Sequence, residues 1–277
     1  LFFMPNHVTN KLTISGDKTA FEYLQRRVAH DSNIFDINSF FPMPERLRDI
    51  SVPTKILSDD EYQEWEKKKV LGKLGEYDMV VGQPITKSIS DKLVKEYGCN
   101  NWYDWAINNW GTKWGSYDSS FDSKKKTYTF LTAWDPPIKA IMKLSEMYPT
   151  LRMKLKYSDE DFGNYVGEVT FKAGKIVKHF EPEKGIEAYL FAMDINGDEE
   201  YLISRLSDIE DGEDLKEPFY QFCIYLAVKR HGFSDKFPSK VLEAIMELYV
   251  QEEMYERAGQ VKKILDRSEE HTSELQS

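Results

Sequence analysis

The segment that decides the fold reads Asn101-Trp-Tyr-Asp-Trp-Ala-Ile-Asn-Asn-Trp-Gly-Thr-Lys-Trp-Gly115. It holds four of the six tryptophans in the chain, and Trp134 follows soon after. Each buried indole covers roughly 150–250 Å² and needs a hydrogen-bond partner for its N–H. We therefore expect this segment to lie at the centre of a hydrophobic core or of a binding surface.

Strands are predicted around this segment wherever apolar and polar residues alternate. The cleanest alternation is Leu151-Arg-Met-Lys-Leu-Lys-Tyr157, and weaker runs cover residues 8–15, 34–41, 115–121, 127–134, 165–172 and 176–180. Helical spacing predicts helices over residues 17–28 and 138–148, and one inserted helix from residue 88 through the tryptophans. The order β-α-β, insertion, β-hairpin, α, β, β predicts a ferredoxin-like α+β sandwich. Its sheet is antiparallel, with two helices on one face.

Charge divides the chain into two regions. Residues 1–180 carry 26 Lys and Arg against 24 Asp and Glu, whereas residues 181–277 carry 11 against 23. We therefore predict a ferredoxin-like domain over residues 4–180, with an insertion at about 42–114, and an acidic, mainly helical region over residues 181–266. Three short amphipathic helices are expected in the second half of that region. Asn196-Gly197 is typical of a hairpin turn.

Composition excludes several classes of protein. Hydrophobic residues make up 41% of the chain, which is enough for a core, and no apolar run approaches the ~20 residues of a membrane span. Cys99 and Cys223 are too isolated for a Cys-x-x-Cys site and are expected to be free thiols in a reducing cytosol. These features predict a cytoplasmic protein of the host cell that makes no contact with the membrane.

Both ends of the sequence are unusual. Met4-Pro5-Asn6 reads as a natural start, so residues 1–3 are expected to come from upstream readthrough. The last residues, Arg267-Ser-Glu-Glu-His-Thr-Ser-Glu-Leu-Gln-Ser277, resemble a translated sequencing adapter. We expect residues 267–277 to be a non-native tail, with a native polar tail as the alternative.

Three separated motifs resemble the YubB ferredoxin-like family, which comprises plasmid and phage proteins of unassigned function. The motifs are Met4-Pro-Asn-His-Val-Thr-Asn-Lys-Leu12, Asn109-Trp-Gly-Thr-Lys-Trp-Gly115 and Thr132-Ala-Trp-Asp-Pro-Pro-Ile138. The resemblance covers about residues 4–180. It implies the same fold that the periodicity predicts and an origin in a mobile genetic element. It implies no catalytic residues, because none are assigned for the family.

No motif for a cofactor, a metal or a catalytic set is present in the sequence. Gly16-Asp-Lys-Thr19 lacks the glycine spacing of a phosphate loop, and Asp194-Ile-Asn-Gly-Asp198 lacks the sixth and twelfth residues of a calcium loop. His7 is expected to be a structural hydrogen-bonding residue. The carboxylates nearest the motifs, which are expected to be surface or turn acids, are Asp104, Asp159, Glu160 and Asp161.

The tryptophans allow two interpretations. In the first, Trp102, Trp105, Trp110 and Trp114 pack the inserted helix onto the sheet. In the second, the indoles form the walls of a ligand cleft that polar side chains complete. The candidate cleft residues are His7, Asn109, Trp110, Thr112, Lys113 and Trp114.

The sheet offers a second candidate surface. Alternation places five basic side chains on the face away from the helices, where they form a candidate phosphate-binding stripe. They are Lys11, Arg152, Lys154, Lys156 and Lys172. Sheets that bind RNA also need aromatic rings on that face, whereas alternation sends Tyr157 to the core and leaves Tyr128 and Phe130 undecided. A solvated basic face is the alternative.

Three functions follow from these observations. The first is a non-catalytic accessory protein of a phage or plasmid, which binds an unknown protein partner through its acidic helical region. The second is a nucleic-acid-binding protein that uses the basic sheet face. The third is an enzyme whose site lies near His7 and the tryptophans.

Overall fold

The computed structural model describes residues 6–75, 82–197, 199–207, 209, 215–230, 234, 237–251 and 254–274, with the side chains of residues 201 and 268–274 left out. The chain divides into two compact units after Glu181. This division falls one residue from the predicted boundary.

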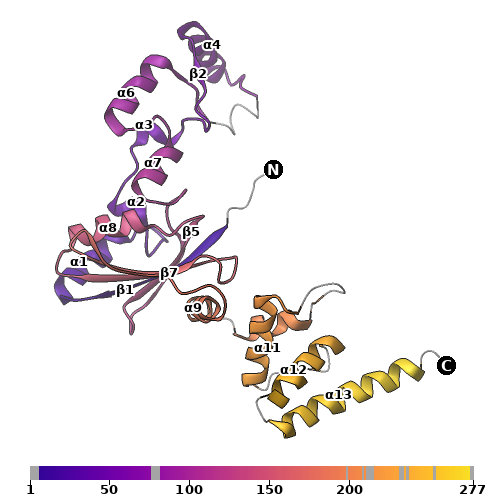
Figure 1. Ribbon diagram of the computed structural model, residues 1–277. Coiled ribbons are helices and arrows are strands. Elements are labelled where there is room, and N and C mark those ends of the chain that lie inside the picture. Colours follow the sequence, from indigo (N-terminus) through magenta and orange to yellow (C-terminus); the bar gives the residue numbers. More distant parts are fainter. Residues whose placement is uncertain are drawn as a thin grey trace. The chain divides into compact units, whose positions relative to one another are not determined.

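Unit 1 is built on a six-stranded sheet in the order β4-β5-β1-β6-β7-β8 (Figure 1). The pairing of neighbouring strands is antiparallel throughout. The strands are β1 (His7–Ser15), β4 (Tyr117–Asp122), β5 (Thr127–Ala133), β6 (Arg152–Asp159), β7 (Val166–Lys172) and β8 (Lys175–Phe180). The first four occupy the places of a ferredoxin-like sheet, and β7 and β8 extend it. The predicted α+β ferredoxin-like fold is therefore confirmed.

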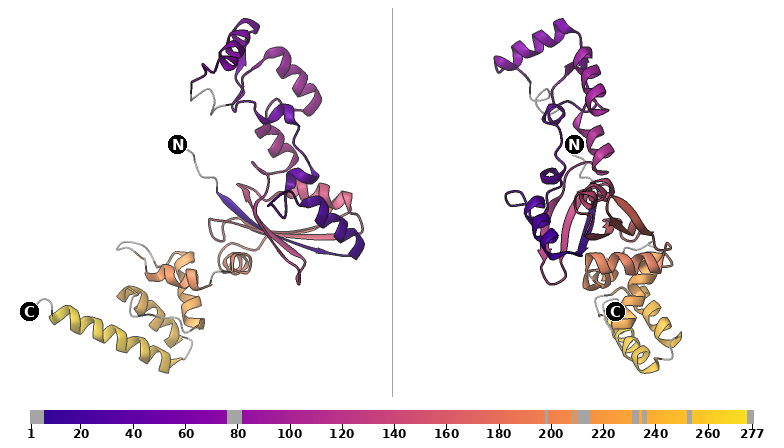
Figure 2. Two further views of the ribbon diagram at one scale, coloured as in Figure 1. Left: turned by 180° about the vertical axis from the view of Figure 1, so that it is seen from behind. Right: turned by 90° about the vertical axis from the view of Figure 1, so that its left-hand side faces the viewer.

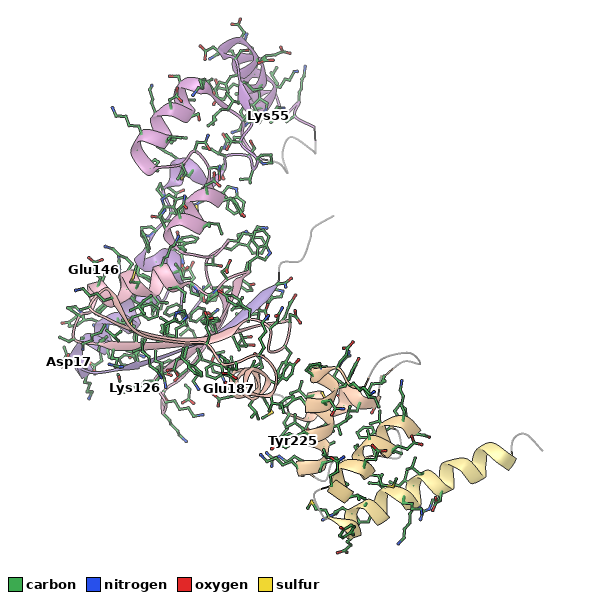
Figure 3. The ribbon with its side chains drawn as sticks, viewed as in Figure 1. Asp17, Lys55, Lys126, Glu146, Glu187 and Tyr225 are labelled. Carbon is green, nitrogen blue, oxygen red and sulfur yellow. The ribbon has the colours of Figure 1, made fainter. Side chains whose placement is uncertain are left out.

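Two helices cover one face of the sheet (Figures 1 and 2). Helix α1 spans Lys18–Val28 and begins where the Asp17 side chain accepts a hydrogen bond from the Ala20 N–H at 2.7 Å (Figure 3). Helix α8 spans Ile138–Met147. Side chains of both helices join the core residues of β1, where Val8, Leu12 and Ile14 are buried. The alternation along β1 thus decides which face the helices cover.

Residues 34–41 do not form the predicted second strand. They bend into a short helix, α2 (Ile37–Phe40), which the Asp36 side chain caps. The Ser116 Oγ accepts a hydrogen bond from the Ile37 N–H at 3.1 Å and donates one to the Phe35 carbonyl at 2.5 Å. A serine side chain therefore satisfies backbone groups that a strand would have paired. The second strand of the ferredoxin-like order is β4, which follows the insertion.

The insertion consists of small elements between Phe41 and Trp110. They are α3 (Glu45–Arg48), β2 (Ile56–Leu57), α4 (Asp59–Val70), β3 (Ile85–Thr86), α6 (Lys87–Tyr97) and α7 (Trp102–Asn109). Strands β2 and β3 pair in parallel. Helix α4 begins where Ser58 and Glu61 form a complete capping box.

The predicted single helix from residue 88 through the tryptophans is two helices. Helix α6 ends at Gly98, whose φ of +78° is readily adopted only by glycine. Helix α7 then begins afresh, because the Asn101 side chain accepts a hydrogen bond from the Asp104 N–H at 2.9 Å. The break allows α7 to take its own direction over the core.

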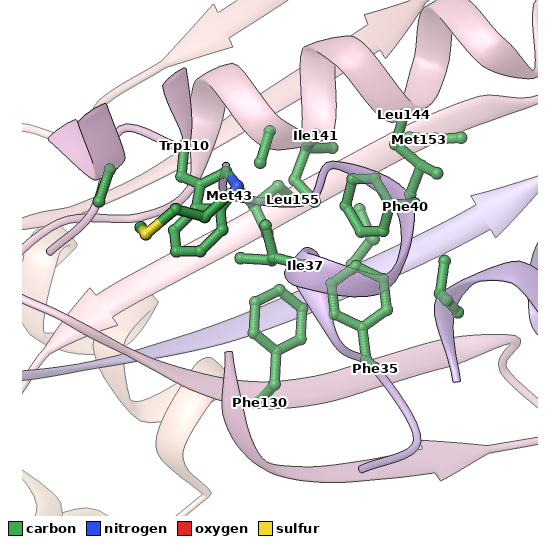
Figure 4. Close-up of a cluster of buried hydrophobic side chains, with 14 of the residues drawn as sticks. Phe35, Ile37, Phe40, Met43, Trp110, Phe130, Ile141, Leu144, Met153 and Leu155 are labelled. Carbon is green, nitrogen blue, oxygen red and sulfur yellow. The ribbon is translucent and has the colours of Figure 1, made fainter. Parts of the chain in front are cut away.

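Aromatic rings fill the space between the sheet and the helices (Figure 4). Phe35 stacks on Phe130 with ring centroids 4.5 Å apart, and Trp105 meets Trp110 edge to face at 5.3 Å. Tyr128 and Phe130, whose positions the sequence left undecided, are both buried in this core. Two of the four clustered tryptophans are therefore core residues, as the first interpretation predicts.

Unit 2 is helical in the part that the structure describes. Its helices are α9 (Ile186–Asn196), α10 (Glu199–Ser204), the 3-10 turn η1 (Arg205–Ser207), α11 (Pro218–Arg230), α12 (Ser239–Gln251) and α13 (Tyr255–Glu274). The three predicted helices correspond to α11, α12 and α13. The predicted hairpin turn at Asn196-Gly197 is instead the end of α9, where Gly197 has a φ of +77° and its N–H donates to the Met193 carbonyl. No helix among the residues described is both long and apolar enough to cross a membrane.

Candidate functional site

Two motif segments that are about 20 residues apart in the sequence lie side by side. Residues 110–115 follow α7, and residues 132–138 connect β5 to α8. The Thr112 Oγ donates a hydrogen bond to the Ala133 carbonyl at 2.8 Å, and the Lys113 N–H donates to the same carbonyl at 3.4 Å. Thr112 is buried, so this junction is protected from water. It places Lys113 beside Trp134.

Lys113 lies between two indole rings. Its ammonium group is 4.6 Å from the centroid of Trp114 and 4.1 Å from that of Trp134. The two tryptophans are 38% and 39% exposed, and Tyr103 packs edge-on against Trp134. We call these residues (Lys113, Trp114, Trp134 and Tyr103) the aromatic–lysine cluster. Contacts of a cation with indole faces are favourable, by about 0.5–1 kcal/mol at exposed sites.

Trp134 has an unusual backbone conformation. Its φ is +72°, a left-handed value that is costly for a bulky L-residue. Its N–H donates to the Asn6 carbonyl at 2.8 Å, which fixes the residue against the start of β1. The surrounding structure thus holds a strained residue with its ring half exposed, an arrangement typical of functional sites.

The six candidate cleft residues do not form one cleft. Trp110 is buried in the core and its Nε1–H donates to the Phe41 carbonyl at 2.8 Å. His7 bonds through Nδ1 to the Tyr117 hydroxyl at 2.8 Å, as expected for a structural histidine. Asn109 lines a groove beside α8. Only Lys113 and Trp114 remain together, and Trp114 is not the core residue that the first interpretation predicts. The sequence did not predict the contact between Lys113 and Trp134, although Trp134 lies in the motif at residues 132–138.

The basic stripe lies on the face away from the helices. Lys11 is directly opposite Lys156, and Arg152 is directly opposite Lys172 in the strand register. The buried Glu168 neutralises part of this surface, because its carboxylate lies 3.7 Å from the Lys154 ammonium and 3.3 Å from that of Lys178. Tyr128, Phe130 and Tyr157 all lie on the opposite, core face. The stripe is therefore less positive than the sequence indicated, and these three rings are unavailable to stack bases.

One carboxyl group is buried at the end of β6. Asp159 was expected to be a surface or turn acid, but β6 continues through it and only 9% of the residue is exposed. Burial, followed by the negative charge of Asp161, raises the pKa of Asp159 to about 6. One of its carboxyl oxygens, Oδ1, has no hydrogen-bond partner. A charge at this position is therefore costly to the fold.

The part of the chain that the structure describes contains no obvious metal-binding site. No three His, Cys, Asp or Glu side chains there are grouped so as to hold a metal ion. Cys99 and Cys223 are buried free thiols, and burial raises the pKa of both.

The left-handed backbone of Trp134 makes a testable prediction. We expect Trp134→Gly to be about 1 kcal/mol more stable than Trp134→Ala, since glycine adopts a positive φ without the cost of a Cβ. The free energy of unfolding in urea measures the difference. The same two substitutions at Trp114, whose φ is not positive, serve as the control and should not favour glycine. Equal stabilities at residue 134 would show that the backbone strain is absent.

A second prediction concerns the pH dependence of stability. Asp159 is protonated in both states below pH 4. Between about pH 4 and 6 the folded protein holds this proton and the unfolded chain releases it, so stability falls as the pH rises. Above pH 6 the full cost of about 3 kcal/mol is present. Asp159→Asn should therefore gain about 2 kcal/mol relative to the wild type between pH 4.5 and 7.5, because about 1 kcal/mol of the cost is already present at pH 4.5.

Urea unfolding at the two pH values measures this gain. Asp31→Asn is the control, because the Asp31 side chain is 86% exposed. A difference between the wild type and Asp159→Asn that does not change with pH would contradict the prediction.

A family comparison finds a ferredoxin-like domain in part of the chain. Residues 109–202 match a family model described as a ferredoxin-like domain in Api92-like protein. The crystal structure of protein api92 from Yersinia pseudotuberculosis is similar at 10% identity, with a TM-score of 0.36, over 66% of this chain and 99% of that chain. No curated protein matches the sequence. The chain therefore contains a ferredoxin-like domain similar to that of Api92-like proteins, whose function is unknown.

Proposed function

We propose that this protein is a non-catalytic accessory protein of the YubB type, encoded by a phage or plasmid, and that it acts by binding another protein. The motif resemblance supports the mobile-element origin, and the ferredoxin-like fold agrees with it. The aromatic–lysine cluster is the observation that carries the interaction.

The cluster has the properties of an interface anchor. Tryptophan and tyrosine are enriched among the residues that contribute most to protein–protein affinity, because a large rigid ring loses little conformational freedom on binding. Trp114 and Trp134 expose more than a third of their surfaces although both belong to segments that the core fixes in place. A partner that covers these rings would bury them without reorganising the fold.

Unit 2 offers a further contact area, as the sequence predicts for the acidic region. Val250, Met254 and Tyr255 lie at the junction of α12 and α13 and are 46%, 39% and 65% exposed. The surrounding residues 181–277 carry 23 acidic against 11 basic side chains. Charge of one sign around apolar residues favours a partner with a basic surface.

Affinity capture with the tagged full-length chain tests this function. Trp114→Ala/Trp134→Ala should lose most of the partner that the wild type recovers from a host lysate. Trp65→Ala is the matched control, since Trp65 in α4 also carries a lysine ammonium, that of Lys69, 5.2 Å from its ring. Removal of residues 182–277 tests the acidic region separately. If Trp114→Ala/Trp134→Ala and the protein without residues 182–277 both recover as much partner as the wild type, the proposal is contradicted.

Nucleic-acid binding is the second candidate, and the shared face of the five basic residues favours it. A gel shift with single-stranded DNA or RNA at low salt tests it, since phosphate contacts weaken as salt rises. Lys154→Glu/Lys156→Glu should abolish a shift that Lys124→Glu, in the β4–β5 turn, leaves intact. A wild-type protein that gives no shift at low salt would exclude this candidate.

A further inference from the structure

A groove of about 560 Å³ opens beside α8, and its lining includes no residue of the aromatic–lysine cluster. Four segments form it: Phe41 after α2, the end of α7 with Asn108 and Asn109, the outer side of α8 with Lys139 and Lys143, and the β7–β8 turn with Lys175. This volume lies within the range of sites for small ligands, about 300–1,000 Å³. The groove belongs entirely to unit 1.

The turn that forms one wall is fixed against the helix. Ala173 and Gly174 both have a positive φ, and the Gly174 N–H donates to the buried Ser145 Oγ at 3.0 Å. A Cβ on Gly174 would come within 3.1 Å of the Glu146 Cβ, so this close approach and the positive φ both favour glycine. Figure 3 labels Glu146 on α8, the helix that this turn contacts. The wall that carries Lys175 is therefore built into the fold.

The lining of the groove is positively charged. It contains three lysines and one carboxylate, that of Glu146. The Lys139 ammonium donates to the Ile107 carbonyl at 3.1 Å. A carbonyl has no net charge, so this contact does not neutralise the lysine. Lys143 pairs with Glu146 at 2.6 Å, but both side chains are about half exposed, and such surface pairs are weak. An anionic ligand would meet two or three ammonium groups, and replacing the weak Lys143–Glu146 pair would cost little free energy.

The remaining lining residues give the ligand further character. Phe41 and Met142 are half-buried and provide an apolar floor, and two asparagines provide amide donors and acceptors. Asn109 is held in place, because its Nδ2–H donates to the Trp105 carbonyl at 2.9 Å. This bond leaves the carbonyl oxygen and the second N–H of the amide for other contacts. Lysines beside an apolar floor suit a molecule that carries several phosphate groups on a compact body.

We propose that this groove is a binding site for a small polyphosphate-bearing ligand, held by Lys139, Lys143 and Lys175. The amides and the floor contact the rest of the molecule. This site is independent of the protein-binding surface proposed above.

Isothermal titration calorimetry of the full-length protein at low salt tests the site, with inorganic triphosphate, ATP and adenosine as separate probes. Triphosphate and ATP should bind and adenosine should not. Tighter binding of ATP would identify a nucleotide, and equal binding would identify the phosphate chain alone. Both results support the site.

Charge reversal locates the binding. Lys139→Glu/Lys175→Glu should weaken triphosphate binding by about tenfold or more, because charged hydrogen bonds are replaced by repulsion. Lys92→Glu/Lys124→Glu makes the same change in net charge at exposed positions elsewhere in unit 1 and should leave binding intact. Thermal melts confirm that both proteins fold. Absence of triphosphate and ATP binding at millimolar concentration, or an equal loss in the two proteins, would overturn the proposal.

Discussion

A buried hydrogen bond anchors the insertion of unit 1, in which the Trp110 Nε1–H donates to the Phe41 carbonyl at 2.8 Å. These two residues mark the ends of the insertion, and they are 69 positions apart in the sequence. Only 4% of Trp110 is exposed, and its ring packs edge to face against Trp105. The bond closes the insertion into a loop that leaves and rejoins the sheet domain at one place. Closing a long loop costs conformational entropy, which this buried aromatic contact offsets.

This closure explains the rest of the architecture. Because the chain returns at Trp110, residues 116–122 can run beside residues 127–133 and supply the strand that residues 34–41 do not. The same return brings Thr112 and Lys113 against Ala133, and so assembles the aromatic–lysine cluster on the surface. It also sets the end of α7 beside α8, where Asn109 lines the groove. Both candidate sites are therefore consequences of how the insertion is anchored.

The sequence predicted the elements whose pattern is local. Alternation identified β1 and β6, and helical spacing identified α1 and α8. The strand predicted over residues 34–41 does not form. The isoleucines and phenylalanines of this segment favour a strand, but its backbone groups are satisfied by the Ser116 side chain, a contact 79 or more residues distant. Periodicity carries no information about such a contact.

The candidate site was only partly predictable for a similar reason. A helical wheel does not separate buried Trp110 from exposed Trp114, because the chain turns at Gly111, where φ is +84°. Asp159 looked like a turn acid because three acidic residues follow Ser158 in the sequence. The pairing of β6 with β1 extends through it, and that pairing decides its burial. Composition and spacing indicated which residues matter, whereas tertiary pairing decided which of them meet.

Native-state hydrogen exchange on Trp110→Phe tests the anchoring most directly. Phenylalanine keeps most of the ring volume but leaves the Phe41 carbonyl without its partner, at a cost of about 1–3 kcal/mol. We predict faster exchange of amides in α6 and α7, with unchanged exchange in the central strand β1. Unchanged exchange in α7, or an equal acceleration in β1, would contradict it.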